Sequence, residues 1–298
     1  MARTYKTPAA FKAALEAKLK ERAKLRVGGI DRLRQRFVME RFLARVVQVF
    51  QDAATLKGGL ALELRLANAR STKDIDLRSM GDPSDVLSRL RSAATSDLGD
   101  HLAFQVDPDP DHPNIDAVYE GRRFRVVCTL ASMPYARPFG VDVGMADPMY
   151  GPVDFLDGED FLDFVPVAPL RVPAYPVETH IAEKLHAYTR VFPPGRENSR
   201  HRDLPDLALL SGVRAIQGAA LRAAIQTTFA FRKSHDAPAS VPLPPASWEA
   251  PYRKLAAENA LPWPTLSEVH AAVAAFLDPV LLGHDGLWEP SARAWRAV

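Results

Sequence analysis

The spacing of apolar residues predicts two helices at the start of the chain. Residues 8–26 place Phe11, Leu15 and Leu19 four positions apart among strong helix formers. Residues 32–51 repeat the same apolar period and are predicted to form the second helix. Many of the positions between the apolar ones are Lys or Arg, so the polar faces of both helices are expected to be basic.

The middle of the chain alternates between strand-like and helix-like runs. Helices are predicted near residues 60–67 and 83–95. The predicted strands lie at residues 54–59, 74–79, 104–107, 122–132, 139–145 and 164–170. This alternation predicts an α+β layer domain with a mixed sheet over residues 53–172.

After Pro173 and Pro176 the apolar pattern is typical of helices alone. The predicted helices lie near residues 178–191, 203–212, 216–230, 246–258 and 265–280. Prolines, a glycine and polar residues predict a loop over 191–202, and the tail after Gly283 is expected to be irregular. We therefore predict three parts: a basic helical head packed on the α+β domain, at residues 1–52, the α+β domain itself, at 53–172, and an all-helical C-terminal domain, at 173–298.

The distribution of charge changes this picture more than the overall composition does. The chain has 298 residues, of which 47% are apolar and 25% charged, and this excludes a wholly disordered or collagen-like protein. Residues 1–45 hold 13 Lys/Arg and 4 Asp/Glu, a balance of +9, whereas the rest of the chain has a balance of −7. A basic segment favours a polyanionic partner such as RNA, DNA or an acidic protein.

Cysteine content and hydropathy indicate the compartment. The single cysteine, Cys128, excludes a disulfide framework within the chain, and its apolar neighbours indicate a core position. No apolar run approaches 18 residues, and the charged N-terminus does not resemble a signal peptide. A cytoplasmic protein without a membrane partner is therefore expected.

The most informative stretch reads as strand, glycine turn, helix, loop and strand over residues 56–79. Gly58 and Gly59 allow the backbone to approach a ligand, and the following helix would present free N–H groups to a phosphate. Glycine pairs also close ordinary strand-to-helix turns, so this signal alone is weak. Ser71 and Thr72, before the next strand, are candidates for a phosphate contact or for capping of the loop.

Asp74 and Asp76 strengthen the functional interpretation. Alternate residues of a strand point to one face, with Cα atoms about 6.6 Å apart, so both carboxylates are expected to face the same space. Two carboxylates there repel one another unless a cation lies between them, and oxygen ligands favour Mg²⁺. The alternative is a solvated edge strand with two harmless aspartates.

These residues resemble the DNA polymerase β-like nucleotidyltransferases, and specifically the AbiEii/AbiGii group that includes the MenT toxins. The resemblance lies in Lys57-Gly58-Gly59, Ala61-Leu62, Leu64-Arg65, Arg70 and Asp74-Ile75-Asp76-Leu77. It resumes at residues 181–187 and 202–207 and covers roughly residues 50–215. Gly59 departs from the wider superfamily, where many members have Ser, although the AbiEii group commonly shares the glycine.

The resemblance implies a set of site residues. Asp74 and Asp76 would bind metal together with a third carboxylate, for which Asp142 is the best candidate and Asp147 and Glu120 are rivals. Two Mg²⁺ ions would then act during turnover. The triphosphate of an NTP would contact the remaining group of residues: Lys57, Gly58, Gly59, Arg70, Ser71, Thr72, Lys184 and Arg202, with Arg200 a further candidate. Asp206, and with less support Asp203, would hold Lys184 in place.

The resemblance also implies an activity and partners. The expected enzyme is a nucleotidyltransferase toxin of a toxin–antitoxin pair with a role in phage defence, which moves NMP from an NTP to the 3′ end of tRNA and releases pyrophosphate. A cognate antitoxin protein is the expected partner. Two alternatives stay open: transfer to a protein or a small molecule such as an aminoglycoside, and a non-catalytic protein of the same fold that binds RNA or a partner.

Overall fold

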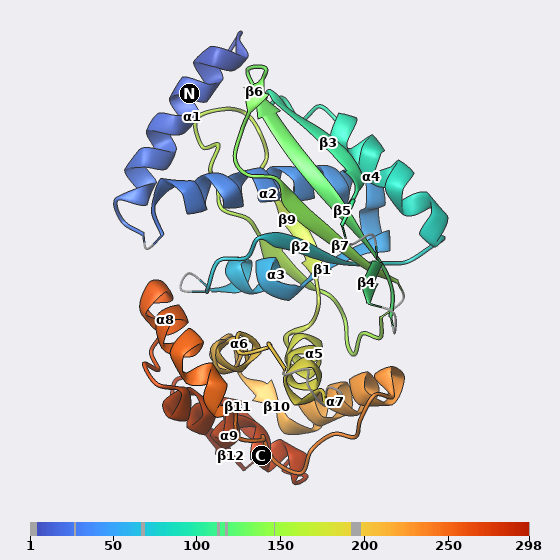
Figure 1. Ribbon diagram of the computed structural model, residues 1–298, viewed down its shortest axis with the longest axis vertical. Coiled ribbons are helices and arrows are strands. Elements are labelled where there is room, and N and C mark those ends of the chain that lie inside the picture. Colours follow the sequence, from blue (N-terminus) through green and yellow to red (C-terminus); the bar gives the residue numbers. More distant parts are fainter. Residues whose placement is uncertain are drawn as a thin grey trace. The chain divides into compact units, whose positions relative to one another are not determined.

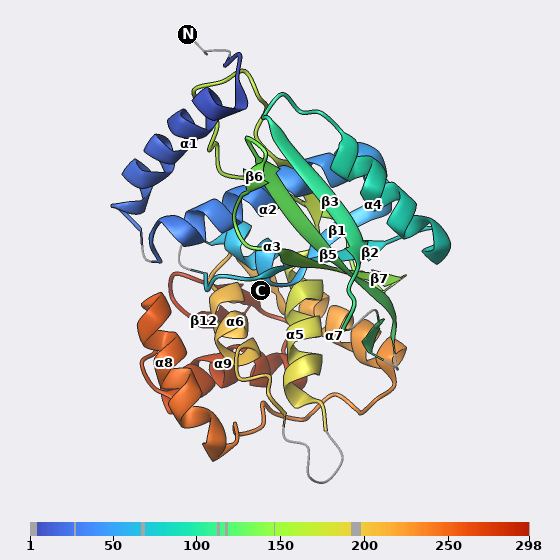
Figure 2. The ribbon, with the colours of Figure 1, turned by 45° about the horizontal axis from the view of Figure 1, so that its top comes forward.

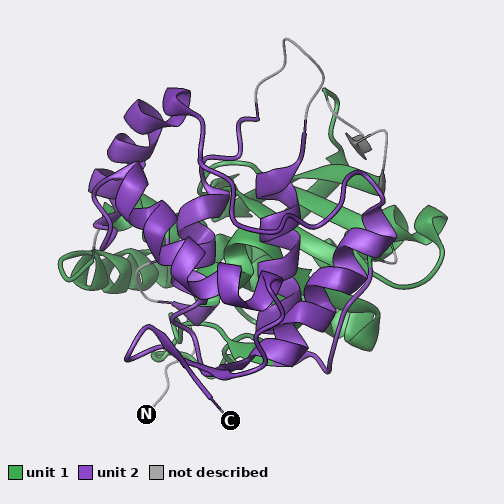
Figure 3. Ribbon diagram, turned by 90° about the horizontal axis from the view of Figure 1, so that it is seen from below, with its two compact units in different colours: residues 1–64, 70–147, 155–174 green, residues 65–69, 148–154, 175–298 purple. Residues whose placement is uncertain are grey.

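The computed structural model forms two compact units, which are distinguished by colour in Figure 3. Unit 1 comprises residues 1–64, 70–147 and 155–174, and unit 2 comprises residues 65–69, 148–154 and 175–298. The structure describes residues 5–26, 28–66, 69–111, 114–116, 119–145, 147–191 and 198–297.

Unit 1 is an α+β assembly, as the alternation of periods predicts (Figure 1). Its helices are α1 (Pro8–Ala23), α2 (Gly29–Phe50), α3 (Gly58–Arg65, the last residue of which belongs to unit 2) and α4 (Val86–Thr95). Its strands are β1 (Ala54–Lys57), β2 (Asp74–Ser79), β3 (Leu102–Pro108), β4 (Asn114–Asp116), β5 (Tyr119–Leu130), β6 (Met133–Pro134), β7 (Phe139–Met145), β8 (Asp154–Asp157) and β9 (Arg171–Ala174).

The strands of unit 1 form a mixed sheet in the order β3-β5-β7-β2-β1-β9-β8, with β4 and β6 paired to β5. β2 runs parallel to β7 and antiparallel to β1, whereas β5 runs antiparallel to β7. Helices α2 and α4 pack together on the sheet, and α1 packs on α2 (Figures 1 and 2). The position of β2 between β1 and β7 brings three chain segments together at the predicted site.

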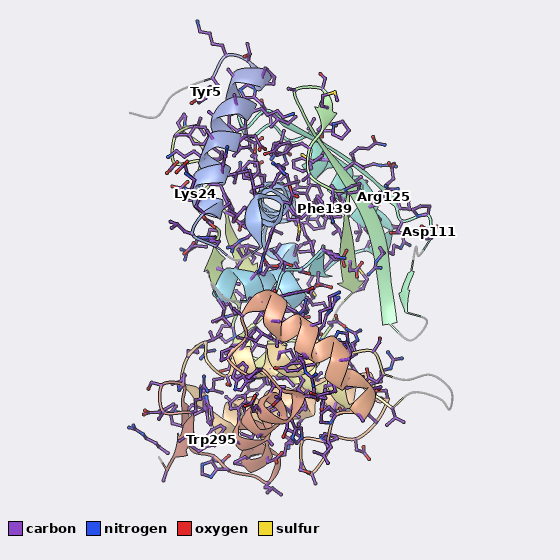
Figure 4. The ribbon with its side chains drawn as sticks, turned by 60° about the vertical axis from the view of Figure 1, so that its left-hand side comes forward. Tyr5, Lys24, Asp111, Arg125, Phe139 and Trp295 are labelled. Atoms are coloured by element: carbon purple, nitrogen blue, oxygen red, sulfur yellow. The ribbon has the colours of Figure 1, made fainter. Side chains whose placement is uncertain are left out.

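The core of unit 1 occupies the helix-covered face of this sheet. Ile75 and Leu77 of β2 and Val141 and Val143 of β7 are buried there, at alternate positions of their strands. Phe139 lies between the sheet and α2 (Figure 4), where its ring centroid is 5.7 Å from that of Phe42. Because side chains alternate along a strand, the residues between these apolar ones face the opposite side of the sheet.

One predicted strand of unit 1 is wrong. Residues 164–170 contain no strand, and the strand begins later, at Arg171. Pro166 and Pro169 lack the backbone N–H groups that a sheet ladder needs, which explains why this apolar run stays out of the sheet. Nearby Val165 is nevertheless buried in the core, so the run serves packing and not strand pairing.

The basic head is largely neutralised by acidic residues of the same unit. Arg45 and Arg41 bind the buried carboxylate of Asp100 with N–O distances of 2.6 and 2.7 Å. On α1, Arg22 forms a salt bridge with Glu159 at 3.0 Å, and Lys18 forms one with Asp163 at 3.2 Å. The balance of +9 is therefore not a continuous basic surface, and much of it stabilises the packing of the head.

Unit 2 is mainly helical, as expected. Its helices are α5 (Val177–Thr189), α6 (Asp203–Leu210), α7 (Gly218–Arg232), α8 (Glu249–Asn259) and α9 (Leu266–Leu281). α5 packs on α6 and α7, and α9 packs on α6 and α7. Of the predicted loop at 191–202, residues 192–197 lie outside the described part of the chain, and residues 198–202 contain no helix.

Two details of unit 2 correct the predictions. The tail is not irregular and the unit is not purely helical, because β11 (Leu287–Glu289) and β12 (Ala294–Arg296) form an antiparallel hairpin that pairs with β10 (Ile216–Gln217). Three rings anchor this small sheet. Trp288 and Trp295 lie 4.8 and 5.9 Å from Phe276 of α9, measured between ring centroids. Packing against α9 stabilises strands that are too short to be recognised from their own sequence.

Candidate active site

Three carboxylates share the face of the unit 1 sheet that lies opposite the buried core. Asp74 and Asp76 are half-buried and alternate along β2 with buried residues, as the sequence predicts. Asp142 of β7 is directly opposite Asp76 in the parallel register. Because paired residues on neighbouring strands point to the same face, the three side chains lie on one side of the sheet.

Two glycines make room for these carboxylates. Gly58 has φ +66°, which other residues rarely adopt, and a Cβ atom there would lie 2.0 Å from an oxygen of Asp76. Gly140, opposite Asp74 on β7, donates a backbone N–H to Asp74 Oδ1 at 3.2 Å, and a Cβ there would lie 2.5 Å from that oxygen. The glycine turn therefore positions Asp76, while β7 positions Asp74.

Arg123 compensates part of the negative charge. Its guanidinium makes two hydrogen bonds of 2.6 Å to the two oxygens of Asp142, which lies opposite it across β5 and β7. The pKa of Asp74 is raised above its usual value by burial and by the charge of Asp142, while Arg123 and the Gly140 N–H act in the opposite direction. Arg123 thus compensates Asp142, while the pKa of Asp74 stays raised.

The rival aspartate, Asp147, has a different surrounding. It forms an ion pair with Lys57, which is opposite Asp76 on β1, and its backbone carbonyl accepts a hydrogen bond of 2.5 Å from Arg78 Nε. Lys57 is therefore held beside the glycine turn by a carboxylate from beyond the end of β7. The side chain of Glu120, the other rival, lies outside the described residues.

The loop before β2 is tied to the glycine turn. Thr72 donates its backbone N–H to the carboxylate of Glu63 on α3, and its hydroxyl occupies the space beside Gly59, 2.6 Å from where a Cβ would stand. Burial raises the pKa of Glu63. Ser71 is exposed, and Arg70 is half-buried near Glu63. Gly59 thus permits close packing of the loop on the start of α3.

The donor set suits a hard cation without forming a finished cage. Oxygen ligands from one or two carboxylates, with further positions left for substrate, are what Mg²⁺ uses in phosphate-transfer sites. Within the described residues, no group of three or more His, Cys, Asp or Glu is gathered closely enough to hold a metal ion. Asp142 would have to turn from Arg123 to join Asp74 and Asp76 in such a group.

The two later stretches of the family resemblance, residues 181–187 and 202–207, lie together inside unit 2. Lys184 of α5 binds Asp203 and Asp206 at the start of α6, with N–O distances of 2.7 and 2.8 Å. Both carboxylates are buried, and Arg202 before them is exposed. Lys184 therefore contacts both aspartates, while its role in the site and the contact of Lys184 or Arg202 with a triphosphate stay predictions.

Sequence reasoning missed Arg123 and Glu63. Arg123 lies in a run of strand residues that contains Arg122 and Arg125 as well, and only the register between β5 and β7 distinguishes it. Glu63 lies on the short helix after the glycine turn, four residues after Gly59. Its position could be used for prediction only with the knowledge that the loop before β2 brings Thr72 next to this helix.

Comparison with known proteins identifies the family. The profile of the family described as nucleotidyl transferase AbiEii toxin of type IV toxin–antitoxin systems matches residues 41–279. The chain belongs to this family. The AbiEii match covers both the carboxylate face and the Lys184 motif, and it makes the protein a nucleotidyltransferase of the toxin–antitoxin class. No curated protein sequence gives a match.

A solved structure shares the fold of this AbiEii-family chain. MenT4, a nucleotidyltransferase toxin from Mycobacterium tuberculosis, is similar with a TM-score of 0.55 and 18% identity, over 91% of this chain and 99% of MenT4. JHP933 from Helicobacter pylori is similar with a TM-score of 0.42 and 15% identity, over 81% of this chain and 93% of JHP933. The fold is that of the polymerase β-like nucleotidyltransferases. None of the described helices has the length and apolar character needed to cross a membrane.

Proposed function

We propose that this nucleotidyltransferase moves NMP from an NTP to the 3′-terminal hydroxyl of tRNA in a Mg²⁺-dependent reaction that releases pyrophosphate. The observation that carries the proposal is the placement of Asp74, Asp76 and Asp142 on one sheet face beside the glycine turn. The raised pKa of Asp74 supports it, because carboxylates that repel one another bind a divalent cation favourably.

Asp74, Asp76 and Asp142 are the residues that would hold Mg²⁺. The bound metal would neutralise charge on the phosphates and on the leaving pyrophosphate. Around it, the chain supplies orientation: Gly58 and Gly59 bring the backbone close, and Lys57 adds a positive charge held by Asp147. The contacts of Arg70, Ser71, Thr72, Lys184 and Arg202 with the NTP belong to the same proposal.

The acceptor is the finer part of the proposal. The relatives of the AbiEii family are toxins of toxin–antitoxin systems, which implies an antitoxin partner and a target whose modification stops growth. A tRNA 3′ end fits this requirement, because a nucleotide added there blocks aminoacylation. The cations of unit 1 that are not neutralised within the head offer phosphate contacts for such an acceptor.

Transfer of radioactive label tests both parts. The protein is incubated with each α-labelled NTP in turn, with Mg²⁺ or with EDTA, in the presence of total RNA and total protein. We expect label in tRNA-sized RNA with Mg²⁺, and none with EDTA. Label in protein bands would show that the acceptor is a protein and not tRNA. Transfer that resists EDTA would overturn the metal dependence. No label with any acceptor would overturn the proposed reaction.

A further inference from the structure

A cavity of about 800 Å³ lies within unit 1, apart from the carboxylate face. Helices α1, α2 and α3 line it together with the loop before β2 and the loop before β7. Six cationic and three acidic side chains contribute to the lining: Lys12, Arg32, Arg34, Arg36, Lys73 and Arg137, with Glu16, Asp31 and Glu63. A cavity of this size with an excess of positive charge suits an anionic ligand.

Part of the charge that lines the cavity is already compensated. Arg34 binds Glu16 with N–O distances of 2.9 and 2.7 Å, and the hydroxyl of Tyr135 donates to Glu16 at 2.7 Å. The hydrogen bonds from Arg34 lower the pKa of Glu16, so this group stays ionised and paired. The charges of Arg34 and Glu16 therefore offset one another, and the surplus of positive charge comes from other lining residues.

The surplus comes from four residues that reach the cavity from separate elements: Lys12, Arg32, Lys73 and Arg137. Among the described residues, Lys73 and Arg137 form no ion pair with any acidic group. Arg32 is half-buried at 4.0 Å from Glu63, which is at the limit of an ion pair. Burial and the neighbouring Arg36 and Arg26 lower the pKa of Arg32 despite that carboxylate, as expected where cations outnumber anions.

The loop that carries Arg137 is fixed in position. The amide of Gln35 on α2 donates to the carbonyl of Arg137 at 3.2 Å and accepts its N–H at 3.0 Å. The neighbouring Ala136 has φ +62°, a left-handed conformation that costs of order 1 kcal/mol in a residue other than glycine. A loop held in this way presents Arg137 to the cavity without a further ordering cost on binding.

The cavity and the candidate active site share one short loop. Ser71, Thr72 and Lys73 line the cavity, whereas Asp74, the next residue, faces the carboxylate side of the sheet. Thr72 also packs against the Gly59 turn. A ligand in the cavity would therefore lie next to the loop that positions Asp74.

We propose that this cavity binds phosphate groups along the backbone of the nucleic-acid acceptor, an inference that rests on the proposed function for the identity of the acceptor. Cations that reach a cavity from separate elements, two of which, Lys73 and Arg137, form no ion pair with described residues, suit a chain of phosphates better than a single carboxylate. Two exposed cations of the head are instead paired with acidic residues: Lys18 with Asp163, and Lys24 with Glu21 at 2.8 Å. Lys24 lies on the side of α1 away from the sheet (Figure 4).

Two triple variants with equal charge change test the cavity. One replaces Lys12, Lys73 and Arg137 by Gln, and the matched control replaces Lys18 and Lys20 of α1 and Lys24, directly after it, by Gln. The probe is a fluorescent single-stranded RNA of twelve nucleotides, titrated without NTP or Mg²⁺ at several salt concentrations. We expect the cavity variant to bind 10- to 100-fold more weakly, with a salt slope lower by about 2, as follows from three phosphate contacts on a single strand. The control should bind RNA within about threefold of the unmodified protein.

The outcomes separate this proposal from the proposed function. Equal weakening by both triples, or no weakening by either, would overturn the cavity as the RNA site. Weaker binding of labelled NTP by the cavity variant, with RNA binding intact, would assign the cavity to the nucleotide and also overturn it. Because the assay requires no transfer, failure of the labelling reaction leaves the binding result in place. Thermal unfolding midpoints of both triples, equal to that of the unmodified protein, show that folding is not the cause.

Discussion

Two clusters of aspartates in this chain differ in how their charge is compensated. On the unit 1 sheet, Asp74, Asp76 and Asp142 share a face where Arg123 bonds to Asp142 alone. In unit 2, Asp203 and Asp206 are both bound by Lys184 at less than 3 Å and are almost fully buried. In the first cluster the pKa of Asp74 stays raised, whereas in the second one lysine binds both carboxylates.

The family resemblance assigns both clusters to one nucleotide site, whereas the difference in charge compensation predicts different roles for them. A metal site needs carboxylates whose charge is not fully compensated within the protein. The raised pKa of Asp74 indicates such a carboxylate, because the charge of Asp142 disfavours its ionised form. A buried ion pair that is satisfied by its own geometry gains little from a ligand, and removal of one partner is costly. We therefore expect the carboxylate face to be decisive for chemistry, and the Lys184 cluster to be decisive for stability.

The largest expected effect is loss of transfer on substitution of the carboxylate face. Asp74→Asn and Asp76→Asn should each lower the transfer rate by about 10³-fold or more, because each removes a candidate metal ligand. The free energy of unfolding should change by less than about 1 kcal/mol, since both side chains are half-buried among like charges. Single-turnover transfer and urea unfolding measure the two quantities.

The control for this prediction is Asp85→Asn, an exposed aspartate at the start of α4. It should leave both the rate and the stability unchanged. Transfer that persists in either Asp74→Asn or Asp76→Asn at more than a tenth of the normal rate would remove the carboxylate face from the chemistry, and the contrast between the clusters would disappear with it.

The second effect concerns Lys184. Lys184→Met should lower the free energy of unfolding by about 3–5 kcal/mol, because it leaves two buried carboxylates without their nearest cation. The double variant Lys184→Met with Asp206→Asn should recover part of this loss, since one buried charge is removed as well. Urea unfolding measures both, with Lys254→Met, at an exposed position of α8, as the control.

The family resemblance predicts a different result for the same residue. If Lys184 acts mainly on the triphosphate, the Met variant should be as stable as the unmodified protein and slow in transfer. Unchanged stability with a rate that falls a hundredfold would reverse the contrast between the two clusters. A combined loss would show that the lysine serves both the fold of unit 2 and the nucleotide.

Glu40 of α2 is an intermediate case, a buried carboxylate with Arg36 as a close cation at 2.7 Å. Burial raises the pKa of Glu40 to about 7, with Arg36 acting in the opposite direction. Because the folded-state pKa lies above the unfolded value of 4.5, the stabilisation is complete below about pH 4.5 and is lost as pH rises through about 7. Glu40→Gln should remove this loss.

The stability of Glu40→Gln relative to the unmodified protein should therefore rise between pH 5 and pH 8, by on the order of 2 kcal/mol. Urea unfolding across this range measures the difference. Glu258→Gln, on an exposed face of α8, should show a difference that stays constant with pH. A constant difference for Glu40 would mean that Arg36 compensates its charge as fully as Lys184 compensates Asp206.

The sequence predicts the parts of this site that depend on local period. The strands at 74–79 and 139–145 have the predicted bounds, and the alternation of β2 places Asp74 and Asp76 on one face. The pairing of Lys184 with Asp206 was expected from the resemblance. These features follow from residues close together in the chain, or from motifs that the family retains.

The remaining features depend on contacts that no local pattern encodes. The bond of Arg123 to Asp142 requires the register of β5 on β7, which is set by the whole sheet. The irregular segment at 164–170 has the apolar content of a strand, and only the prolines oppose that interpretation. The partial neutralisation of the head by Asp100 and Glu159 joins residues more than fifty positions apart.

The smallest expected effect is on metal affinity, through Arg123. In the structure this arginine occupies both oxygens of Asp142 and adds a positive charge next to Asp74. Arg123→Gln should therefore make Asp142 available and tighten the apparent affinity for Mg²⁺ in the transfer reaction about fivefold, which corresponds to roughly 1 kcal/mol. Arg125→Gln is the matched control, because it removes the same charge two residues along β5, from an exposed side chain (Figure 4). It should change the Mg²⁺ dependence by less than twofold. Unchanged or weaker Mg²⁺ affinity in Arg123→Gln would mean that Arg123 positions Asp142 for the metal instead of competing with it. The charge of the carboxylate face would then be compensated within the protein, and the contrast with the Lys184 cluster would be lost.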